Sequence, residues 1–288
     1  MSAGIGRVAR LDPGLYLVAT PIGNARDITL RALDTLAGAD VIAAEDTRTA
    51  RRLMNMHAIA LGERPLLSYH DHSKAPARAR LLHEIEQGRS VAYVSEAGSP
   101  LVADPGFALA REAALRGLPV TSVPGPTAMI AALSVSGLAS DRFLFAGFLP
   151  NASGARKKVL GELADVPATL IFFESAKRIH KSLDDMVLIL GGTRQGAICR
   201  ELTKKFEETL RGPLDELRQQ VDARTLKGEI VVVLGRGTGR ASVQDMEAAL
   251  REALRTMSVK DAAAHVAGRL DLPRRQVYQA ALSLGKTR

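Results

Sequence analysis

Short apolar runs alternate with helical patterns along the first half of the chain. Runs of strand length lie at 15–19, 41–44, 91–94 and 120–123. Runs that are mostly apolar throughout are typical of strands covered on both faces. Apolar residues at helical spacing predict helices between them, at about 28–36, 81–88, 108–116 and 128–135. This alternation predicts an α/β domain with a largely parallel sheet.

The second half of the chain has a different pattern. Strands are predicted at 143–148, 169–173, 197–202 and 229–234, with a helix at 176–190 between the second and third. Gly137 breaks the helix that precedes this region, so we expect one α/β domain at 1–137 and a second at 138–235. This agrees with about 150 residues per domain.

Beyond Leu234 every pattern is helical. Residues 235–240 form a Gly-rich basic linker, because Gly235-x-Gly237-x-Gly239 lacks the Gly-Lys-Ser/Thr ending of a phosphate loop. Helices are predicted at 243–256, 259–270 and 274–284; Ser242 and Ser258 begin capping boxes, and Pro273 occupies a first helical position. The pattern indicates a helix-turn-helix-like domain at 241–288, and a bundle that only packs is the alternative.

Composition and charge narrow the class of protein. The chain has 39 Lys+Arg against 31 Asp+Glu, a net charge of +8, which favours an anionic partner but equally fits a basic enzyme. The single cysteine, Cys199, cannot form an internal disulfide, so a cytoplasmic location is expected. No apolar run approaches the roughly 18 residues that cross a bilayer, and residues 1–12 do not predict a signal peptide.

Each long apolar run of the first domain ends in a small loop that is acidic or rich in Gly and Pro. The four loops are 20–24, 45–48, 95–100 and 124–127. Ligands bind at the carboxyl ends of strands in open α/β sheets, where Gly and Pro allow rigid, close backbone approach. Each loop alone fits an ordinary turn, but four at one sheet edge predict a small-molecule site. The first loop lacks the Gly-x-Gly-x-x-Gly spacing of a dinucleotide site.

The segment Tyr69-His70-Asp71-His72 has the composition of a metal site without its spacing. Two histidines one residue apart are not a helical pair, and no Cys or His cluster completes a ligand set. We therefore expect no metal, and interpret the segment as a polar loop that contacts RNA or supplies a proton acceptor.

Taken in order, these loops resemble a known enzyme family. The motifs that carry the resemblance are Thr20-Pro21-Ile22-Gly23-Asn24, Ala44-Glu45-Asp46-Thr47-Arg48, Tyr69-His70-Asp71-His72, Ser95 to Pro100, Asp104-Pro105-Gly106, Pro124-Gly125-Pro126, Gly147-Phe148-Leu149-Pro150, Phe172-Phe173-Glu174-Ser175, Arg200-Glu201-Leu202-Thr203-Lys204 and Lys227-Gly228-Glu229. From about Leu15 to its C-terminus, the chain resembles the bacterial 16S ribosomal RNA (cytidine) 2′-O-methyltransferase I family of the tetrapyrrole (corrin/porphyrin) methylase superfamily. Each motif is weak alone, but the ordered set is specific.

The resemblance implies a cofactor, a substrate and an assembly. It implies S-adenosylmethionine in a cleft between two α/β domains, methylation of a decoding-centre cytidine in 16S ribosomal RNA or the small subunit, a homodimer and a small helical C-terminal extension. The implied cofactor residues of the first domain are Pro21, Gly23, Ser95, Glu96, Ala97, Gly98, Ser99, Pro124, Gly125, Thr127 and Ala128. Those that would face them are Phe172, Glu174, Ser175, Glu201, Gly228 and Glu229.

A ribose 2′-hydroxyl is a poor nucleophile until its proton leaves, so a positioned base would help the transfer. The candidate bases are Glu45, Asp46, His70 and Glu96. A salt bridge with Arg48 is the alternative role of Glu45 and Asp46, and structural hydrogen bonding is that of His70. Candidate phosphate contacts are Arg26, Arg48, Arg51, Arg52, Arg156, Lys157, Lys158, Lys177 and Arg178.

Two positions depart from the family's usual pattern: Glu96 stands in place of Asp, and Ser99 in place of Thr. Glu96 places its carboxylate further from the backbone, which would lower the rate if that carboxylate sets the geometry. Two other functions stay open at this point. One is methylation of a tetrapyrrole precursor on carbon, and the other is a non-enzymatic ribosome-assembly factor with a vestigial cofactor pocket.

Overall fold

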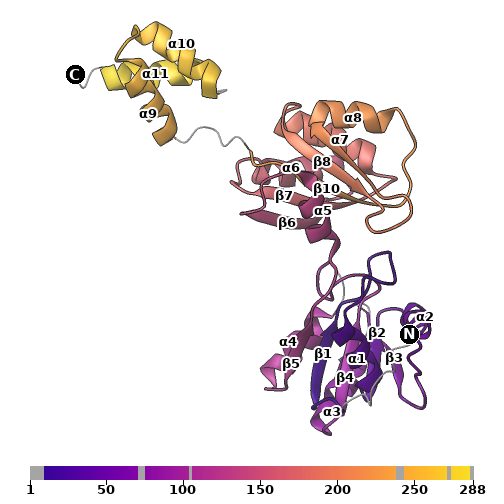
Figure 1. The fold of residues 1–288 in the computed structure, drawn as a ribbon. Coiled ribbons are helices and arrows are strands. Elements are labelled where there is room, and N and C mark those ends of the chain that lie inside the picture. Colours follow the sequence, from indigo (N-terminus) through magenta and orange to yellow (C-terminus); the bar gives the residue numbers. More distant parts are fainter. Residues whose placement is uncertain (1–9, 71–74, 104–105, 238–242, 271–273, 286–288) are drawn as a thin grey trace. The chain divides into compact units, whose positions relative to one another are not determined.

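The computed structural model describes residues 10–70, 75–103, 106–237, 243–270 and 274–285. The chain divides into two compact units (Figure 1). The first unit is Met1–Val135 with Cys199–Glu208, and the second is Ser136–Ile198 with Thr209–Arg288. Of the expected motif residues, Asp71, His72, Asp104 and Pro105 lie outside the described residues, as do Gly239 and Arg240 of the predicted linker.

The first sheet has five strands in the order β3-β2-β4-β1-β5. They are β1 (Gly14–Val18), β2 (Val41–Ala44), β3 (Leu66–Ser68), β4 (Ser90–Val94) and β5 (Val120–Val123), all paired in parallel. The predicted parallel sheet is confirmed, although the short β3 was missed. From the adjacent strands β1 and β4, the chain leaves in opposite directions, to β2 and to β5. This creates a topological switch point at their carboxyl ends, where ligands bind in such sheets.

Both faces of this sheet are covered, which explains the continuous apolar runs. Val41 and Ala43 of β2 pack with residues of α3 (Ala75–Glu86) and α4 (Phe107–Leu115). Ile42 and Ala44 pack on the other face with residues of α1 (Leu30–Gly38) and α2 (Thr47–Met56). The predicted helix after Thr127 is α5 (Ala128–Ser136). The sequence did not predict α2, because only Ala50, Leu53 and Met54 are buried among its polar residues.

The second sheet is mixed and has the order β6-β7-β10-β8-β9. Its elements are β6 (Phe143–Phe148), α6 (Ser153–Leu163), β7 (Thr169–Ser175), α7 (Ile179–Leu190), β8 (Gln195–Arg200), β9 (Glu208–Pro213), α8 (Leu214–Asp222) and β10 (Glu229–Leu234). Strands β6 and β7 are parallel, whereas β7 and β10 are antiparallel. The four predicted strands are present, and β9, α6 and α8 are additional. Leu160, Phe172, Leu183 and Leu217 lie in the core of this sheet and its helices.

The C-terminal helices are α9 (Val243–Ala253), α10 (Val259–Leu270) and α11 (Arg274–Gly285), as predicted. Leu250, Val266 and Val277 are fully buried in a core that these helices make among themselves. The Ser258 hydroxyl accepts a hydrogen bond from the Asp261 amide at 3.2 Å and donates to its carboxylate at 2.6 Å. The Ser258 side chain therefore caps the N-terminus of α10, whereas the Asp261 carboxylate bonds the Ser258 hydroxyl rather than its backbone amide, as a capping box would require. Ser242 and Pro273 lie outside the described residues.

Candidate active site

The loops that follow β1 and β4 are joined at the switch point. The Thr20 amide donates to the Gly98 carbonyl at 2.9 Å, and the Gly98 amide donates back to the Thr20 carbonyl at 3.0 Å. The Ser95 hydroxyl also donates to the Gly98 carbonyl, at 3.0 Å. Gly98 has a φ of +83°, which favours glycine at this position. These bonds hold the two loops in one rigid arrangement.

The loop after β5 joins the same structure. The Ser99 hydroxyl donates to the Pro126 carbonyl at 3.3 Å. A Cβ atom on Gly125 would lie 2.9 Å from that of Ala19, so this close approach requires glycine. The loops that follow β1, β4 and β5 therefore form one continuous floor, which we call the loop floor (residues 19–24, 95–100 and 124–127). It contains all the expected first-domain cofactor residues except Ala128, which begins α5.

Thr127 tests whether the loop floor fits a ligand. Its Oγ1 is buried and has no hydrogen-bond partner in the described part of the chain. A buried hydroxyl without a partner is costly, so such groups usually mark a missing ligand or water. S-adenosylmethionine offers amino, carboxylate and hydroxyl groups that would satisfy it. The loop floor therefore fits the expected cofactor.

One candidate base, Glu96, belongs to this floor, and two others follow the neighbouring strand β2. Glu45 and Asp46 follow β2, and Glu96 follows β4, its neighbour in the sheet. The Asp46 carboxylate accepts from the Arg48 amide at 2.7 Å and pairs with the Arg48 guanidinium at 2.8 Å. Hydrogen bonds from Arg48 lower the pKa of Asp46 to about 2. Asp46 is thus a weak base, and it acts as the N-cap of α2. The alternative role foreseen for Asp46, a salt bridge with Arg48, is present.

The Arg48 guanidinium interacts electrostatically with Asp46 and with Glu96 of the loop floor. The hydrogen bond and the charge of Asp46 raise the pKa of the Arg48 guanidinium, and the charge of Glu96 adds to this effect. Glu96 is exposed, Glu45 is partly buried, and His70 is exposed just beyond β3. Glu45, Glu96 and His70 therefore remain as candidate bases.

The exposed face of α2 carries three arginines in its first two turns. Arg48, Arg51, Arg52, Asn55 and Met56 are exposed and follow helical spacing, opposite the buried Ala50, Leu53 and Met54. With Thr47 they line an open groove of about 570 Å³. In the described part of the chain, neither Arg51 nor Arg52 forms an ion pair. The groove therefore presents two cations that no carboxylate neutralises.

The segment 199–208 packs against the loop after β1 within the first unit. The Asn24 amide donates to the Thr203 hydroxyl at 3.1 Å. A Cβ on Gly23 would lie 2.5 Å from Cγ of Lys204, so glycine is needed there. Lys204 in turn pairs with Glu201 at 2.9 Å. The structure thus brings the expected cofactor residues Gly23 and Glu201 into one neighbourhood.

The expected cofactor residues of the second unit separate into two groups. Phe172 is fully buried, and the buried Glu174 carboxylate accepts from the Ser182 hydroxyl at 2.5 Å and the Ser175 amide at 2.8 Å. Their side chains therefore lie in the interior of the second unit, and their contact with the cofactor stays a prediction. Ser175 is the register partner of Glu229 across β7 and β10, and Gly228 precedes Glu229. Ser175, Gly228 and Glu229 consequently lie together at one end of this strand pair.

The predicted basic cluster at 156–158 is also divided. The Arg156 side chain is 4% exposed and pairs with Asp185 at 2.7 Å, so the prediction of a phosphate contact there is wrong. Successive helical residues point about 100° apart, which turns Arg156 inward and leaves Lys158 exposed. Lys157 pairs with Asp185, and Arg178 pairs with Glu174. Arg26 and Lys177 are exposed.

Within the described ranges, no group of three or more His, Cys, Asp or Glu side chains could hold a metal ion. The helices found there also include none long and apolar enough to span a membrane.

Two family models match the chain. Residues 14–218 match the tetrapyrrole (corrin/porphyrin) methylases, and residues 240–285 match the RsmI C-terminal HTH domain. The chain is 47% identical over 279 residues to the ribosomal RNA small subunit methyltransferase I of Mesorhizobium japonicum, covering 96% of this chain and 94% of the relative. It is 43% identical to the protein of the same name from Halalkalibacterium halodurans, covering 93% and 95%.

A solved structure shares the fold. It is the uroporphyrin-III C-methyltransferase from Thermus thermophilus complexed with S-adenyl homocysteine. Its TM-score is 0.53 at 22% identity, with 77% of this chain and 97% of that chain covered.

Proposed function

Because this chain belongs to the ribosomal RNA small subunit methyltransferase I family of the tetrapyrrole methylases, we propose that it methylates the ribose 2′-hydroxyl of a decoding-centre cytidine in 16S ribosomal RNA. The methyl donor is S-adenosylmethionine, and the enzyme acts in the cytoplasm as a homodimer. The observation that carries the proposal is the loop floor, where the buried Thr127 hydroxyl has no hydrogen-bond partner among the described residues.

S-adenosylmethionine supplies an electrophilic methyl group when it is bound. The chain's own residues bind the cofactor and orient it. The loop floor offers a rigid backbone, and Thr127 offers its hydroxyl to the cofactor. Such preorganised positioning accounts for much of the acceleration in group transfer. Ser175, Glu201, Gly228 and Glu229 stay predicted cofactor residues.

Glu96 is our proposed base for the 2′-hydroxyl proton. Its exposed carboxylate follows β4 directly, on the loop that the Thr20–Gly98 bridge holds in place. We expect Glu96→Gln to reduce methyl transfer at saturating S-adenosylmethionine by roughly 100-fold or more, as removal of a general base does. Glu96→Asp, which restores the family's usual residue, serves as the matched variant and retains activity. Full activity in Glu96→Gln would exclude this role.

The substrate is tested directly by mass mapping of 16S ribosomal RNA from a strain that lacks this gene. The expected result is loss of one ribose methyl group, which returns when the gene is restored. In vitro, labelled cofactor is incubated with small ribosomal subunits or with a porphyrin precursor. Label transfer to the precursor alone would overturn the proposal in favour of carbon methylation.

A further inference from the structure

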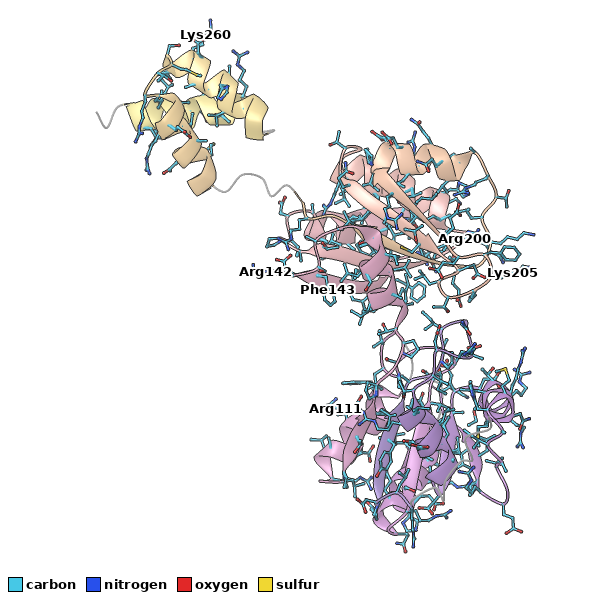
Figure 2. The ribbon with its side chains drawn as sticks, in the orientation of Figure 1. Arg111, Arg142, Phe143, Arg200, Lys205 and Lys260 are labelled. Atoms are coloured by element: carbon cyan, nitrogen blue, oxygen red, sulfur yellow. The ribbon has the colours of Figure 1, made fainter. Side chains whose placement is uncertain are left out.

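The loop between β8 and β9 presents an aromatic ring and a cation to solvent. Phe206 is 64% exposed, and the ammonium of Lys205 lies 5.6 Å from the centroid of its ring. Figure 2 shows the Lys205 side chain extending outward from this loop. We call these two residues the loop tip. A large apolar ring exposed in this way is unexplained by packing within the described chain.

The loop that carries the tip is held in an unusual conformation. Glu201 and Thr203 have φ values of +52° and +64°, a region that residues other than glycine rarely adopt. The Glu207 carboxylate accepts from the Thr203 amide at 2.7 Å, and the Glu207 amide donates to the Lys204 carbonyl at 3.1 Å. Strained backbone that its surroundings maintain is common at ligand sites.

The other charges of the loop already have partners inside it. Arg200 pairs with Glu208 at 3.2 Å, and Lys204 pairs with Glu201 at 2.9 Å. The Glu207 carboxylate accepts its hydrogen bond from the Thr203 backbone amide. Lys205, and the ring face of Phe206 that Lys205 does not cover, are therefore what the loop offers to a partner, and a partner with a negative charge and a flat ring fits both.

The loop tip is next to the proposed active site. The Thr203 hydroxyl receives the Asn24 amide, and Lys204 lies against Gly23, in the loop that continues β1 into the loop floor. An RNA strand that reaches the loop floor would pass this tip. Unpaired bases stack on exposed aromatic side chains, and phosphates bind lysine.

We propose that the loop tip binds single-stranded RNA beside the methylated nucleotide, with Phe206 stacked on a base and Lys205 on a phosphate. This inference rests on the proposed function, because it takes ribosomal RNA as the substrate. The stacked base would hold the strand so that the target ribose is presented to the loop floor.

The test compares Phe206→Ala with Phe107→Ala in the full chain. Phe107 begins α4 in the same unit and is 66% exposed, so it is a matched control for loss of an exposed ring. We expect Phe206→Ala to weaken binding to unmethylated small ribosomal subunits by roughly 5- to 150-fold, the range for one stacked base. Phe107→Ala should bind normally, and both variants should keep wild-type S-adenosylmethionine affinity in calorimetry.

Further variants distinguish stacking from apolar contact. Phe206→Trp should retain subunit binding and Phe206→Leu should not, because leucine has no π-face. Lys205→Gln should make the dependence of log affinity on log salt shallower by about 0.7, as for one phosphate contact on a single strand.

Three results would overturn the proposal that the loop tip binds RNA. They are wild-type subunit affinity in Phe206→Ala, wild-type subunit affinity in Phe206→Leu, or a changed oligomeric state of Phe206→Ala in light scattering. The last would assign the ring to a protein interface. Failure of the proposed function is a separate outcome. In that case the wild-type enzyme transfers no methyl group to subunits, whatever the variants bind.

Discussion

At the scale of single residues, the site depends on groups whose environment the sequence shows only in part. Gly23, Gly98 and Gly125 could be recognised as loop glycines from their motifs. The reason for each is a close approach or a left-handed conformation that involves residues distant in sequence, such as Lys204 for Gly23 and Ala19 for Gly125. The buried hydroxyl of Thr127 likewise has no signal in a local pattern.

The variant Thr127→Val should change S-adenosylmethionine binding and the free energy of unfolding in opposite directions. Valine has nearly the same shape and removes a buried hydroxyl without a partner, so the free energy of unfolding should rise by about 1 kcal/mol. The loss of one hydrogen bond to the cofactor should weaken S-adenosylmethionine binding by roughly 3- to 10-fold. Calorimetry and thermal unfolding measure the two effects.

Thr35→Val is the control for this variant. The Thr35 hydroxyl donates to the Arg31 carbonyl at 2.7 Å, away from the loop floor. Thr35→Val should lower the free energy of unfolding and leave S-adenosylmethionine affinity unchanged. Unchanged cofactor affinity in Thr127→Val would contradict the assignment of Thr127.

The low pKa of Asp46 predicts a pH dependence of stability. Because Arg48 holds this pKa at about 2, below the ordinary value of about 3.9, ionised Asp46 stabilises the folded state. That contribution is complete above about pH 4 and is lost as the pH falls towards 2. Asparagine also caps helices, so Asp46→Asn should lower the melting temperature slightly at pH 7, by an amount that disappears near pH 2. The pH–rate profile between pH 6 and 9 should not change, and a shifted profile would restore Asp46 as a candidate base.

At the scale of elements, helical periodicity decides which charges face solvent. Arg48 lies in the first turn of α2, where a cation is unfavourable to the helix dipole, and its repulsion with Arg51 and Arg52, three and four residues further on, adds to this cost. Residues that destabilise their own helix without a compensating local interaction are expected at functional sites. This supports the prediction that Arg48, Arg51 and Arg52 contact RNA phosphates.

Arg51→Gln/Arg52→Gln tests this assignment. Loss of two phosphate contacts should make the salt dependence of RNA binding shallower by about 1.4 and reduce affinity roughly 25-fold at 0.1 M salt. The matched control is Arg80→Gln/Arg111→Gln, two exposed arginines on α3 and α4, which cover the opposite face of the sheet (Arg111 is labelled in Figure 2). Equal losses in both double variants would indicate a general charge effect rather than a groove.

At the scale of the whole molecule, the chain combines parts with separate cores. The two sheets and the C-terminal helices each bury their own apolar residues. The boundaries at 137/138 and 235/241 stay predictions, and the segment Cys199–Glu208 belongs to the first unit. A motif-by-motif reading of the chain could not show this grouping.

Removal of residues 238–288 should leave S-adenosylmethionine affinity unchanged, because the loop floor lies in the first unit. We expect affinity for small ribosomal subunits to fall several-fold, since the helices carry exposed Arg251, Arg255, Arg274 and Arg275. Filter binding and calorimetry measure the two affinities. Wild-type affinity for small ribosomal subunits after this truncation would show that the C-terminal helices do not contribute to subunit binding.

The sequence by itself determined the α/β class, the long strands and the order of the loops that carry chemistry, because these follow from local apolar periodicity and from contiguous motifs. Tertiary structure alone decided that β4 lies between β1 and β2, which places Glu96 beside Arg48 and joins Gly98 to Thr20. It also turned Arg156 into the core and brought the 199–208 segment against Gly23. Strand order depends on contacts between distant segments, and helical spacing alone does not determine which face of a helix those contacts cover.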